Sequence, residues 1–502
     1  MKLALILLGL ISFFEILVWV RPVWIVRKYY SCALIIVQSL IAGYVFGILP
    51  SIWTCLILLV SVYRNINLLR IVQNRTQNDY LFRVTRKTSL LLICSQILIL
   101  GFVQISRYFN LQAVYWVYIL LIVQLVATLV ILASTLRHLV KSIPPIVNDN
   151  YADKDLPTLT VAIPARNETE DLGQCLTTLA ASTYPKLEIL VLDDCSQNKR
   201  TPEIIRSFAQ QGIRFIEGIP PKQKWLAKNY AYKQLADQAN GEIILFCGVD
   251  TRFKPQSLRA MVECLLEKKK TMISIIPRNN LNTKFGVKEL LIQPSRYAWE
   301  LSLPRRLFNR PGVLSTCWLI TTDALNTCGG FDAVERSTSP ESYFALKTAN
   351  LNDGYSLLHS SEIMGLVSVK GFYEQRATAI RTRYPQLHRR PEMVLLTSIV
   401  ELLILVGPVV LLLVVLFERN WALITPAIIS VLNIKFCYVK IVNLTYRRFV
   451  FRGVWLLSIA AVYDVALLNY SMWQFEFSDI IWKGRNICLP VMRVIASLPK
   501  EY

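Results

Sequence analysis

Carboxylate side chains follow three short runs of apolar, mostly β-branched or aliphatic residues in the middle of the chain. These runs occupy residues 159–163, 187–192 and 243–246. The first is soon followed by Glu168, the second by Asp193 and Asp194, and the third by Asp250. Strands that alternate with helices form a parallel sheet, and their carboxyl ends meet at one edge, where such sheets bind nucleotides. The four acids therefore predict a nucleotide site.

These acids also have a purely structural explanation. An aspartate at a strand end often caps the turn that follows, as Asp193 or Asp194 would here. Because Asp250 ends a further strand at the same predicted edge, we favour the ligand site. The stretch 158–179 is typical of a strand that leads into a helix, where backbone amides can meet an anionic ligand.

Apolar residues are concentrated at the two ends of the chain. Of its 502 residues 54% are hydrophobic and 18% are charged, with a mean hydropathy of +0.41. This combination is typical of a membrane portion joined to a soluble one. We predict a membrane domain of about five helices over 1–139, a soluble domain over 140–391, and a membrane domain of about three helices with a tail over 392–502. The predicted spans are 3–20, 32–49, 51–67, 89–106, 115–136, 393–417, 421–442 and 454–473.

Basic residues orient the predicted membrane domains. Lysines and arginines cluster after the first span, between the third and fourth, and after the fifth. By the positive-inside rule these clusters are cytoplasmic, which places residues 140–391 in the cytoplasm. The formal net charge of +21 is then explained by loops that face anionic lipid. No basic patch interleaved with aromatic residues occurs, so we expect no nucleic-acid partner.

The cysteines and histidines do not have metal-ligand spacing. No Cys-x-x-Cys pair occurs among the 11 cysteines, and the 3 histidines are far apart. Thiols in the cytoplasm stay reduced. The sequence therefore predicts neither disulfides nor a Cys/His metal site.

Short motifs of the predicted soluble domain resemble those of the family 2 glycosyltransferases, which have the glycosyltransferase-A fold. In chain order they are Pro164-Ala165-Arg166-Asn167-Glu168, Asp193-Asp194-x-Ser196, Lys224-Trp225-Leu226-Ala227-Lys228-Asn229, Asp250, Gly329-Gly330-Phe331, Glu341 and Arg381-Thr382-Arg383-Tyr384. No single motif is specific, but their shared order over residues 157–390 is. The resemblance implies an α/β nucleotide-binding domain with a mixed, mostly parallel sheet, inserted between N- and C-terminal transmembrane helix bundles. It also implies a hexosyltransferase-type enzyme that uses a nucleotide sugar.

The resemblance assigns the acidic strand ends to the nucleotide of the donor. Asp193 or Asp194 would hold the base, and Pro164, Ala165 and Glu168 would line the same pocket.

Lys228, together with Asn229, resembles the family's lysine that reaches the donor near its diphosphate. An ammonium group is a suitable point charge for phosphate. The alternative is an exposed helix lysine, since Lys222 and Lys224 stand nearby.

Asp250 corresponds to the last carboxylate of the family's Asp-x-Asp motif, which anchors the donor diphosphate through Mg²⁺ or Mn²⁺. The chain departs from this motif at its first position, which is Gly248. One carboxylate, two phosphate oxygens and waters can still complete an octahedral Mg²⁺ site. We therefore expect a divalent metal cofactor that binds weakly without the donor.

Glu341 resembles the family's catalytic carboxylate, which takes a proton from the acceptor hydroxyl. A carboxylate can do so if burial raises its pKa towards the working pH. The family more often has two acids in a row here. The alternative is a first-turn glutamate after Pro340, placed to stabilise the helix dipole.

Arg381 and Arg383 resemble the basic pair of the membrane-bound family members, with Tyr384 in the place of their tryptophan. Guanidinium groups bind phosphate oxygens bidentately, so the pair would contact the leaving diphosphate. The alternative is a basic run beside the membrane, with Arg376 and Arg389 nearby.

The membrane portion indicates the class of acceptor. A soluble acceptor would not need it, so we expect a lipid or lipid-linked acceptor at the cytoplasmic face of a bacterial inner (plasma) membrane. A non-catalytic membrane subunit and a processive polysaccharide synthase are the alternatives. Glu401 and Asp464 are ionisable residues within predicted spans and thus candidate functional residues.

Trp482-Lys483-Gly484-Arg485 resembles an element near the C-terminus of several membrane glycosyltransferases, where it approaches the cytoplasmic site. Three straight C-terminal spans would place it on the other side of the membrane. Either 393–417 is partly an interfacial helix, as Pro408 would allow, or 454–473 does not cross simply. The sequence leaves both possibilities open.

Overall fold

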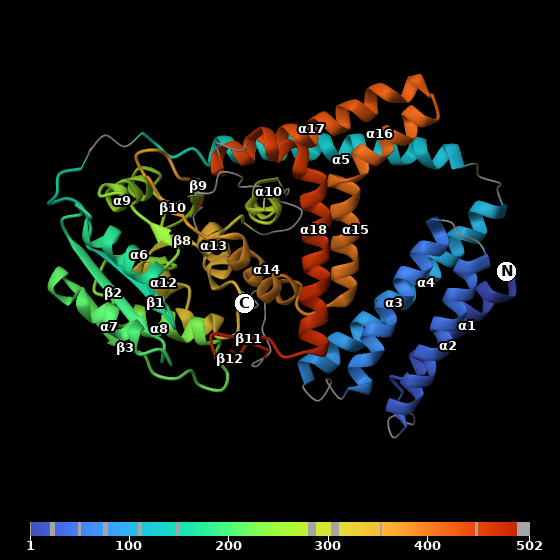
Figure 1. Cartoon of the computed structure of the whole chain (residues 1–502), viewed down its shortest axis with the longest axis horizontal. Helices are drawn as coiled ribbons and strands as arrows, with labels where there is room; N and C mark the ends of the chain where they lie inside the picture. Colours follow the sequence, from blue (N-terminus) through green and yellow to red (C-terminus); the bar gives the residue numbers. More distant parts are fainter. Residues whose placement is uncertain are drawn as a thin grey trace.

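The computed structural model describes most of the chain, as an α/β head between two groups of apolar helices (Figure 1). The described residues are 2–20, 26–48, 52–73, 79–108, 113–146, 151–279, 288–302, 311–351, 354–446 and 450–488.

A seven-stranded sheet forms the centre of the head. Its order is β3-β2-β1-β4-β8-β6-β9, and only β8 runs antiparallel to its neighbours. The strands are β1 (Leu159–Ala165), β2 (Leu187–Asp193), β3 (Ile213–Glu217), β4 (Ile243–Cys247), β6 (Met272–Ile276), β8 (Cys317–Thr321) and β9 (Tyr355–His359). The predicted mixed, mostly parallel sheet is confirmed. The three apolar runs that precede the acids are its β1, β2 and β4.

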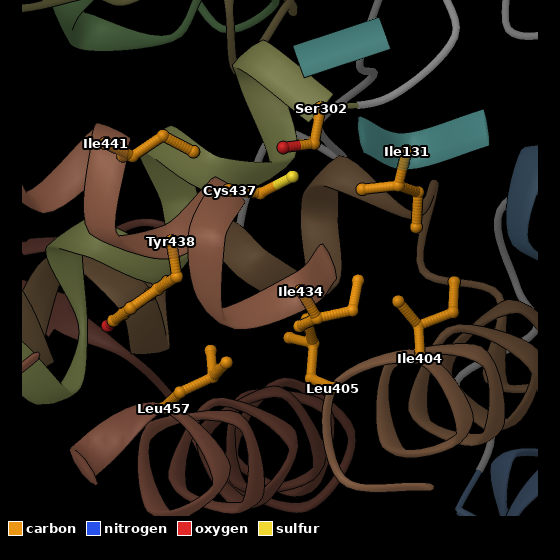
Figure 2. Close-up of a pocket in the computed structure, with 9 residues that line it drawn as sticks. All are labelled: Ile131, Ser302, Ile404, Leu405, Ile434, Cys437, Tyr438, Ile441 and Leu457. Carbon is orange, nitrogen blue, oxygen red and sulfur yellow. The ribbon is translucent and has the colours of Figure 1, made fainter. Parts of the chain in front are cut away.

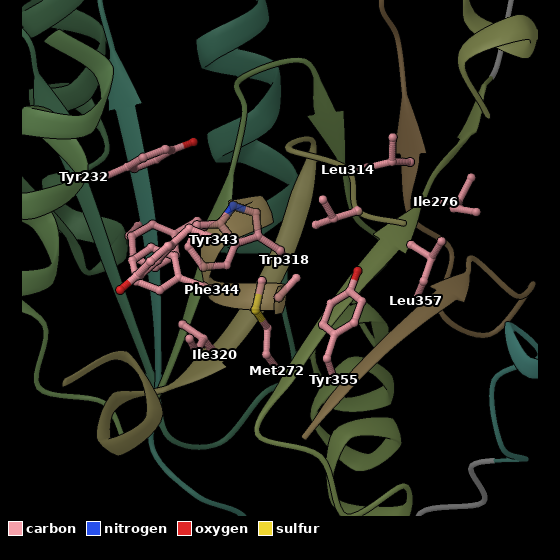
Figure 3. Close-up of a cluster of buried hydrophobic side chains, with 14 of the residues drawn as sticks. Tyr232, Met272, Ile276, Leu314, Trp318, Ile320, Tyr343, Phe344, Tyr355 and Leu357 are labelled. Atoms are coloured by element: carbon pink, nitrogen blue, oxygen red, sulfur yellow. The ribbon is translucent and has the colours of Figure 1, made fainter. Parts of the chain in front are cut away.

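Helices cover both faces of this sheet, which is why its strands are apolar on both sides. They are α6 (Glu170–Ala180), α7 (Arg200–Ser207), α8 (Ala227–Gln238), α9 (Ser257–Glu267), α12 (Thr322–Thr327) and α13 (Pro340–Asn350). On one face, Trp318 of β8 stacks on Phe246 of β4 and on Phe344 of α13, with ring centroids 4.4 and 5.9 Å apart. Tyr232 of α8 completes this aromatic cluster, part of which Figure 3 shows. The cluster fixes α8 and α13, the two helices that carry Lys228 and Glu341.

A small three-stranded sheet positions Asp250, the acid that follows β4. It consists of β5 (Thr251–Arg252), β10 (Val367–Ser368) and β7 (Arg278–Asn279). The backbone N–H of Val369 donates to the Asp250 carbonyl at 3.0 Å. The chain that enters α14 (Phe372–Gln386) therefore passes directly beside Asp250.

The apolar helices form the base of the molecule. They are α1 (Lys2–Leu17), α2 (Arg27–Ile48), α3 (Ile52–Val72), α4 (Asp79–Tyr108), α5 (Ala113–Lys141), α15 (Pro391–Leu405), α16 (Gly407–Phe417), α17 (Trp421–Thr445) and α18 (Val450–Phe477). In the described part of the chain six helices are long and apolar enough to cross a membrane, and α15 with α16 makes up to seven. The helix α1 is also apolar but shorter, with 16 residues.

The predicted span 393–417 is not one straight helix. Its two parts, α15 and α16, are bent by 53° at Val406. Pro408 follows at once and lacks the N–H that would continue the helical ladder. The Gln124 amide of α5 donates to the carbonyl of Leu403, in the last turn of α15, at 2.5 Å. The bend agrees with the first of the two possibilities that the sequence left open.

Side by side in Figure 1, α5 and α17 run along the top and α15 and α18 cross below them. Where these four helices meet α10 (Gln293–Ser302), a gap of about 30 Å³ remains (Figure 2). Its lining is almost entirely apolar, for example Leu405, Ile434 and Leu457. A gap of this size is far too small for a donor or an acceptor, so it is a packing defect of the base.

Candidate active site

The carboxyl edge of the sheet opens into a cavity of about 950 Å³. Its walls come from the head, from α14, and from a hairpin beyond α18 that consists of β11 (Ile481–Trp482) and β12 (Arg485–Asn486). Most of the predicted site residues line it, namely Pro164, Ala165, Glu168, Asp194, Lys228, Asn229, Asp250, Glu341 and Arg381. Asp193, Arg383 and Tyr384 are not among its lining residues.

The two adjacent aspartates at the end of β2 have different environments. Asp193 Oδ1 accepts a hydrogen bond from the Ser196 backbone N–H at 3.2 Å, which is the turn-capping contact named above as the alternative. Asp194 faces the cavity, and its Oδ2 lies 2.5 Å from Arg485 Nη1. Burial raises the pKa of the Asp194 carboxyl, although Arg485 and Arg166 oppose this shift. Of the pair, Asp194 is the one placed to meet a ligand.

The loops after β1 and β2 are held together by Arg166. Its Nη1 donates to the backbone carbonyls of Asp194 and Cys195, each at 2.5 Å. Asn167 and Cys195 have φ values of 50° and 53°. Both loops therefore turn sharply through the left-handed region at the sheet edge.

Lys228 and Asn229 lie in the first turn of α8, and their side chains make different contacts. The Asn229 amide donates to the carbonyls of Val334 and Ser337, each at 2.8 Å, and so ties α8 to the chain that leads into α13. Lys228 Nζ lies over the ring of Tyr232, 5.2 Å from its centroid. Burial lowers the pKa of Lys228, and the nearby carboxylate of Glu341 opposes this shift. Lys228 is not the exposed lysine of the alternative explanation.

Glu341 lies in the first turn of α13, directly after Pro340. It is 3% exposed, lines the cavity and acts on the charge of Lys228 from across it. Its first-turn position agrees with the helix-dipole explanation too, but that explanation does not account for its burial at the cavity. Burial beside a cation instead suits a carboxylate that receives a proton.

Asp250 ends the β4–β5 turn, and its carboxylate lies over the backbone of Gly248. A Cβ atom at position 248 would stand 2.4 Å from Asp250 Oδ1, so the Asp250 carboxylate uses the space that the glycine leaves. Lys370 Nζ lies 3.9 Å from Asp250 Oδ2. Within the described ranges no three His, Cys, Asp or Glu side chains are grouped to hold a metal ion. Since Mg²⁺ keeps several waters, Asp250 fits a metal that arrives with the diphosphate of a donor and does not fit one bound tightly before it.

The basic pair of α14 is divided between the cavity and the base. Arg381 lines the cavity and stacks on Trp482, with its guanidinium carbon 4.3 Å from the ring centroid. Burial lowers the pKa of Arg381 to about 10, and Glu374 opposes this shift. Arg383 instead pairs with Asp464 of α18, because residues two apart on a helix point in nearly opposite directions.

Tyr384 likewise faces the base. It is fully buried, its hydroxyl accepts from Arg70 of α3, and its backbone N–H donates to Ser471 Oγ at 3.1 Å. The structure therefore does not bring Arg383 and Tyr384 to the cavity where the motif predicts them. Glu401, the other candidate within the spans, is buried on α15.

Sequence reasoning did not single out Lys370 and Glu374, which line the cavity beside Asp250. Burial raises the pKa of Glu374, which Lys370 opposes and Asp250 reinforces. These residues belong to no motif, and only the pairing of β10 with β5 brings them to Asp250. Lys483 and Arg485 of the hairpin also line the cavity, although the sequence left the side of their motif open.

Residues 160–329 match the family described as "Glycosyl transferase family 2". Two curated relatives are "Glycosyltransferase AglE" of Haloferax volcanii, 33% identical over 99 residues, and "Probable glycosyltransferase YdaM" of Bacillus subtilis, 24% identical over 211 residues. The alignments cover 19% and 41% of this chain, and 31% and 49% of the relatives, so they span less than half of each of those proteins.

Among solved structures, a similar one is the mannosyltransferase PcManGT from Pyrobaculum calidifontis, in complex with GDP-Man and Mn²⁺. It is 16% identical, with a TM-score of 0.43, over 71% of this chain and 98% of that one. The family match confirms the family that the motifs predict.

Proposed function

Because residues 160–329 form a family 2 glycosyltransferase domain, we propose that this protein is an inverting glycosyltransferase. It moves a hexose from a nucleotide-diphosphate donor to a lipid or lipid-linked acceptor at the cytoplasmic face of a bacterial inner membrane. The observation that carries the proposal is the cavity of about 950 Å³, which is shared by Asp194, Lys228, Asp250, Glu341 and Arg381. A nucleotide end, a diphosphate end and a buried base thus lie in one space large enough for a donor and part of an acceptor.

The donor extends along the sheet edge in this proposal. Asp194 lies at the nucleotide end, and Lys228 and Arg381 stand where the diphosphate is expected. Asp250 would hold a divalent metal ion, which supplies positive charge to the phosphate oxygens when it is bound. Lys228 and Arg381 are both desolvated, so each attracts an anionic leaving group more strongly than a surface cation would.

The acceptor hydroxyl attacks the anomeric carbon from the side opposite the diphosphate. The new bond joins the acceptor oxygen to this carbon, the bond to the diphosphate oxygen breaks, and the configuration inverts. The hydroxyl proton passes to Glu341, and the nucleoside diphosphate leaves with the electron pair of the broken bond. A positioned base of this kind contributes roughly 10²–10⁴-fold to the rate.

The position of α14 supports a membrane-bound acceptor. This helix lines the cavity with Arg381 and Thr378, and it packs on α18 through Arg383 and Tyr384. One wall of the site therefore packs directly on the membrane base. An acceptor held in the membrane would reach Glu341 along this wall, whereas a soluble sugar or protein would not need it.

Glu341→Gln tests the reaction. With a hydroxyl-bearing lipid such as a sterol-like, carotenoid or glycolipid alcohol, the variant should lose at least about a hundredfold in turnover while it binds the donor almost as the wild type does. The measurement is transfer from a panel of UDP-, GDP- and dTDP-sugars to membrane lipid extract by the purified chain, with donor binding followed separately. A polyprenyl phosphate is already ionised and needs no base. Near wild-type transfer by Glu341→Gln would therefore point to a phosphate acceptor, and no transfer by the wild type would point to a non-catalytic subunit.

Thiol labelling tests the proposed orientation. Gln210 is exposed on the head, so Gln210→Cys should resist an impermeant thiol reagent in intact cells and react after permeabilisation. Asn110→Cys, between the fourth and fifth predicted spans, should react in intact cells. Both are compared with the wild-type chain, which has its own cysteines. Labelling of Gln210→Cys in intact cells would overturn the cytoplasmic head.

A further inference from the structure

The helix α14 presents a row of polar side chains to the cavity. The residues of this row are spaced four apart along the helix and all line the cavity, namely Glu374, Thr378, Thr382 and Gln386. At a rise of about 1.5 Å per residue, the row extends over about 18 Å. It begins at Glu374, beside Asp250, and its other three members are uncharged.

The two threonines of this row make different contacts. The Thr378 hydroxyl accepts from Arg381 Nη2 at 3.0 Å, so it supports a side chain already placed at the diphosphate end. The Thr382 hydroxyl donates to the Thr378 carbonyl at 2.8 Å, and its oxygen can still accept from a ligand. Thr382 and Gln386 are therefore the members of the row best suited to bind an uncharged polar group.

Hydroxyl side chains also precede Glu341, the proposed base. Ser337, Thr338 and Ser339 lead into α13 and line the cavity. The backbone N–H of Ser339 donates to Ser337 Oγ at 3.2 Å, and the Ser337 carbonyl accepts from Asn229 at 2.8 Å. This segment thus holds a fixed set of hydroxyl groups next to the position where the acceptor must react.

The charges of the remaining cavity wall balance. Apart from Glu341 and the charged residues at the nucleotide and diphosphate ends, the charged lining residues are Asp171, Lys222, Arg296 and Glu374. These are two acids and two bases, and Asp171 also pairs with Arg252 at 2.7 Å. This part of the wall therefore has no excess of cations among its lining residues to bind the phosphate of an acceptor.

A sugar and an apolar alcohol would meet this wall differently. Each hydroxyl of a sugar both donates and accepts, as threonine, serine and glutamine side chains do. A sterol, a carotenoid alcohol or a diacylglycerol has one hydroxyl on a hydrocarbon body. It would displace water from the polar row without replacing the hydrogen bonds, which is unfavourable. The row therefore fits a group with several hydroxyls.

The opposite side of α14 contacts the membrane base. The helix lies between α13 and α18 (Figure 1), and its Ala379 packs with Leu467 of α18 in a buried apolar cluster. At its first turn Phe372 stacks on Tyr463 of α18, with ring centroids 6.1 Å apart. One helix thus joins a polar cavity wall to the apolar base. An acceptor with a sugar at one end and hydrocarbon at the other matches both sides.

We propose that the acceptor is a glycolipid, and that Thr382 and Gln386 bind hydroxyls of its terminal sugar while another hydroxyl of that sugar attacks the donor. The inference rests on the proposed function and narrows its acceptor to lipids that already carry a sugar. The new bond joins a sugar oxygen of the acceptor to the anomeric carbon of the donor. The proton passes to Glu341, and the nucleoside diphosphate leaves with the electron pair of the broken bond. An earlier glycosyl transfer must therefore attach the first sugar to the lipid.

The first test compares acceptors that differ only in the sugar. The purified full-length chain receives the nucleotide sugar that supports transfer, together with monoglucosyl or monogalactosyl diacylglycerol, diacylglycerol with the same acyl chains, or undecaprenyl phosphate. We expect kcat/KM for one of the glycolipids to exceed that for diacylglycerol at least about 100-fold. A site that hydrogen-bonds its substrate rejects an analogue without the bonding groups by such factors.

Two variants test the polar row itself. Thr382→Val and Gln386→Leu keep the size of the side chain and remove its hydrogen-bonding groups, so each should raise the KM for the glycolipid about 10-fold. The Kd for UDP, GDP or dTDP, measured by titration calorimetry, should stay at the wild-type value. A purely structural role would not separate these two constants, and melting temperatures show whether the variants are folded.

Thr177→Val is the matched control. The Thr177 hydroxyl of α6 donates to the carbonyl four residues earlier, that of Gly173, at 2.9 Å, as Thr382 does to Thr378. Thr177 does not line the cavity, so this variant should keep the wild-type KM for the glycolipid.

The outcomes separate this inference from the proposed function. If diacylglycerol accepts the sugar as well as the glycolipids do, the inference fails and the proposed function stands. Transfer to undecaprenyl phosphate alone also overturns it. If a glycolipid is preferred but Thr382→Val and Gln386→Leu keep its KM, or weaken donor binding instead, the role of the row in acceptor binding is refuted. If the wild type uses none of these acceptors, the inference fails, and failure to bind any of the three nucleoside diphosphates would refute the proposed donor class as well.

Discussion

Charged side chains are arranged differently in the membrane base and around Asp250 in the cavity. In the base, Glu15 and Arg64 are fully buried and lie 2.6 Å apart, and Ser12 and Ser89 add hydrogen bonds to the same pair. In the cavity, Lys370 lies 3.9 Å from Asp250. A closed network holds helices together where no water is available, whereas a looser one keeps its capacity to bind a ligand.

The same contrast occurs within α14, over three residues. Arg381 stacks on an aromatic ring in the cavity, and Arg383 forms an ion pair with Asp464 inside the base. A family motif read along the sequence treats the two arginines alike. The helix separates them by about 200°, so one serves the site and the other serves the fold.

The largest effect on activity is expected at Asp250, the acid of the looser pair in the cavity. Asp250→Asn should abolish transfer, because a donor-borne metal ion loses the motif carboxylate that would hold it. Thermal unfolding without ligand should be unchanged, since the ion-pair partner of the Asp250 carboxylate in the described part of the head is Lys370, at the long distance of 3.9 Å. Transfer assays and melting curves measure the two effects. Full activity in this variant, or wild-type activity that persists in a chelator, would contradict the metal role.

The two arginines of α14 should respond differently to substitution: the Arg381 variant should lose activity and keep its stability, and the Arg383 variant should lose stability and keep its activity. Arg381→Gln should lower kcat/KM about 10- to 100-fold with an unchanged melting temperature, because a desolvated cation near the diphosphate is lost.

Arg383→Gln should lower stability and leave the activity per folded molecule close to that of the wild type. It removes the partner of Asp464, which is 1% exposed, and breaking a buried pair in this way costs about 3–5 kcal/mol. Melting temperature and kcat/KM are measured on both variants in the same detergent. The reverse pattern, an active but unstable Arg381→Gln and an inactive but stable Arg383→Gln, would show that Arg383 and not Arg381 contacts the donor.

Much of the head could be predicted because its signals are local. A short apolar run followed by a turn with acids identifies a strand end, and Asp194 and Asp250 both lie where this rule places them. Lys228 lies in the first turn of a helix that covers the sheet, so its position at the cavity follows from the same pattern. The bend in 393–417 could be suspected at Pro408, but its size depends on the packing against Gln124 of α5.

Other parts of the site could not be predicted because they depend on the meeting of distant segments. The ion pair of Arg485 with Asp194 joins residues 291 positions apart. Lys370 and Glu374 reach Asp250 only through the pairing of β10 with β5. No pattern of composition or spacing contains these distances.

The sequence by itself determined the strands that precede the acids, most of the apolar helices, the edge of the sheet at which the acids gather and the likeness of the head to the family 2 glycosyltransferases, since all of these follow from short-range periodicity and motif order. Only the tertiary structure decided which of two neighbouring acids or arginines faces the cavity, and that the C-terminal hairpin closes the nucleotide end. The direction in which a side chain points depends on its position around the helix and on hydrogen bonds within the loops. The position of the C-terminal hairpin depends on the contact of Glu476 in α18 with Arg70 in α3, two residues 406 positions apart. Short-range preferences do not encode such contacts, which form only when the whole chain is packed.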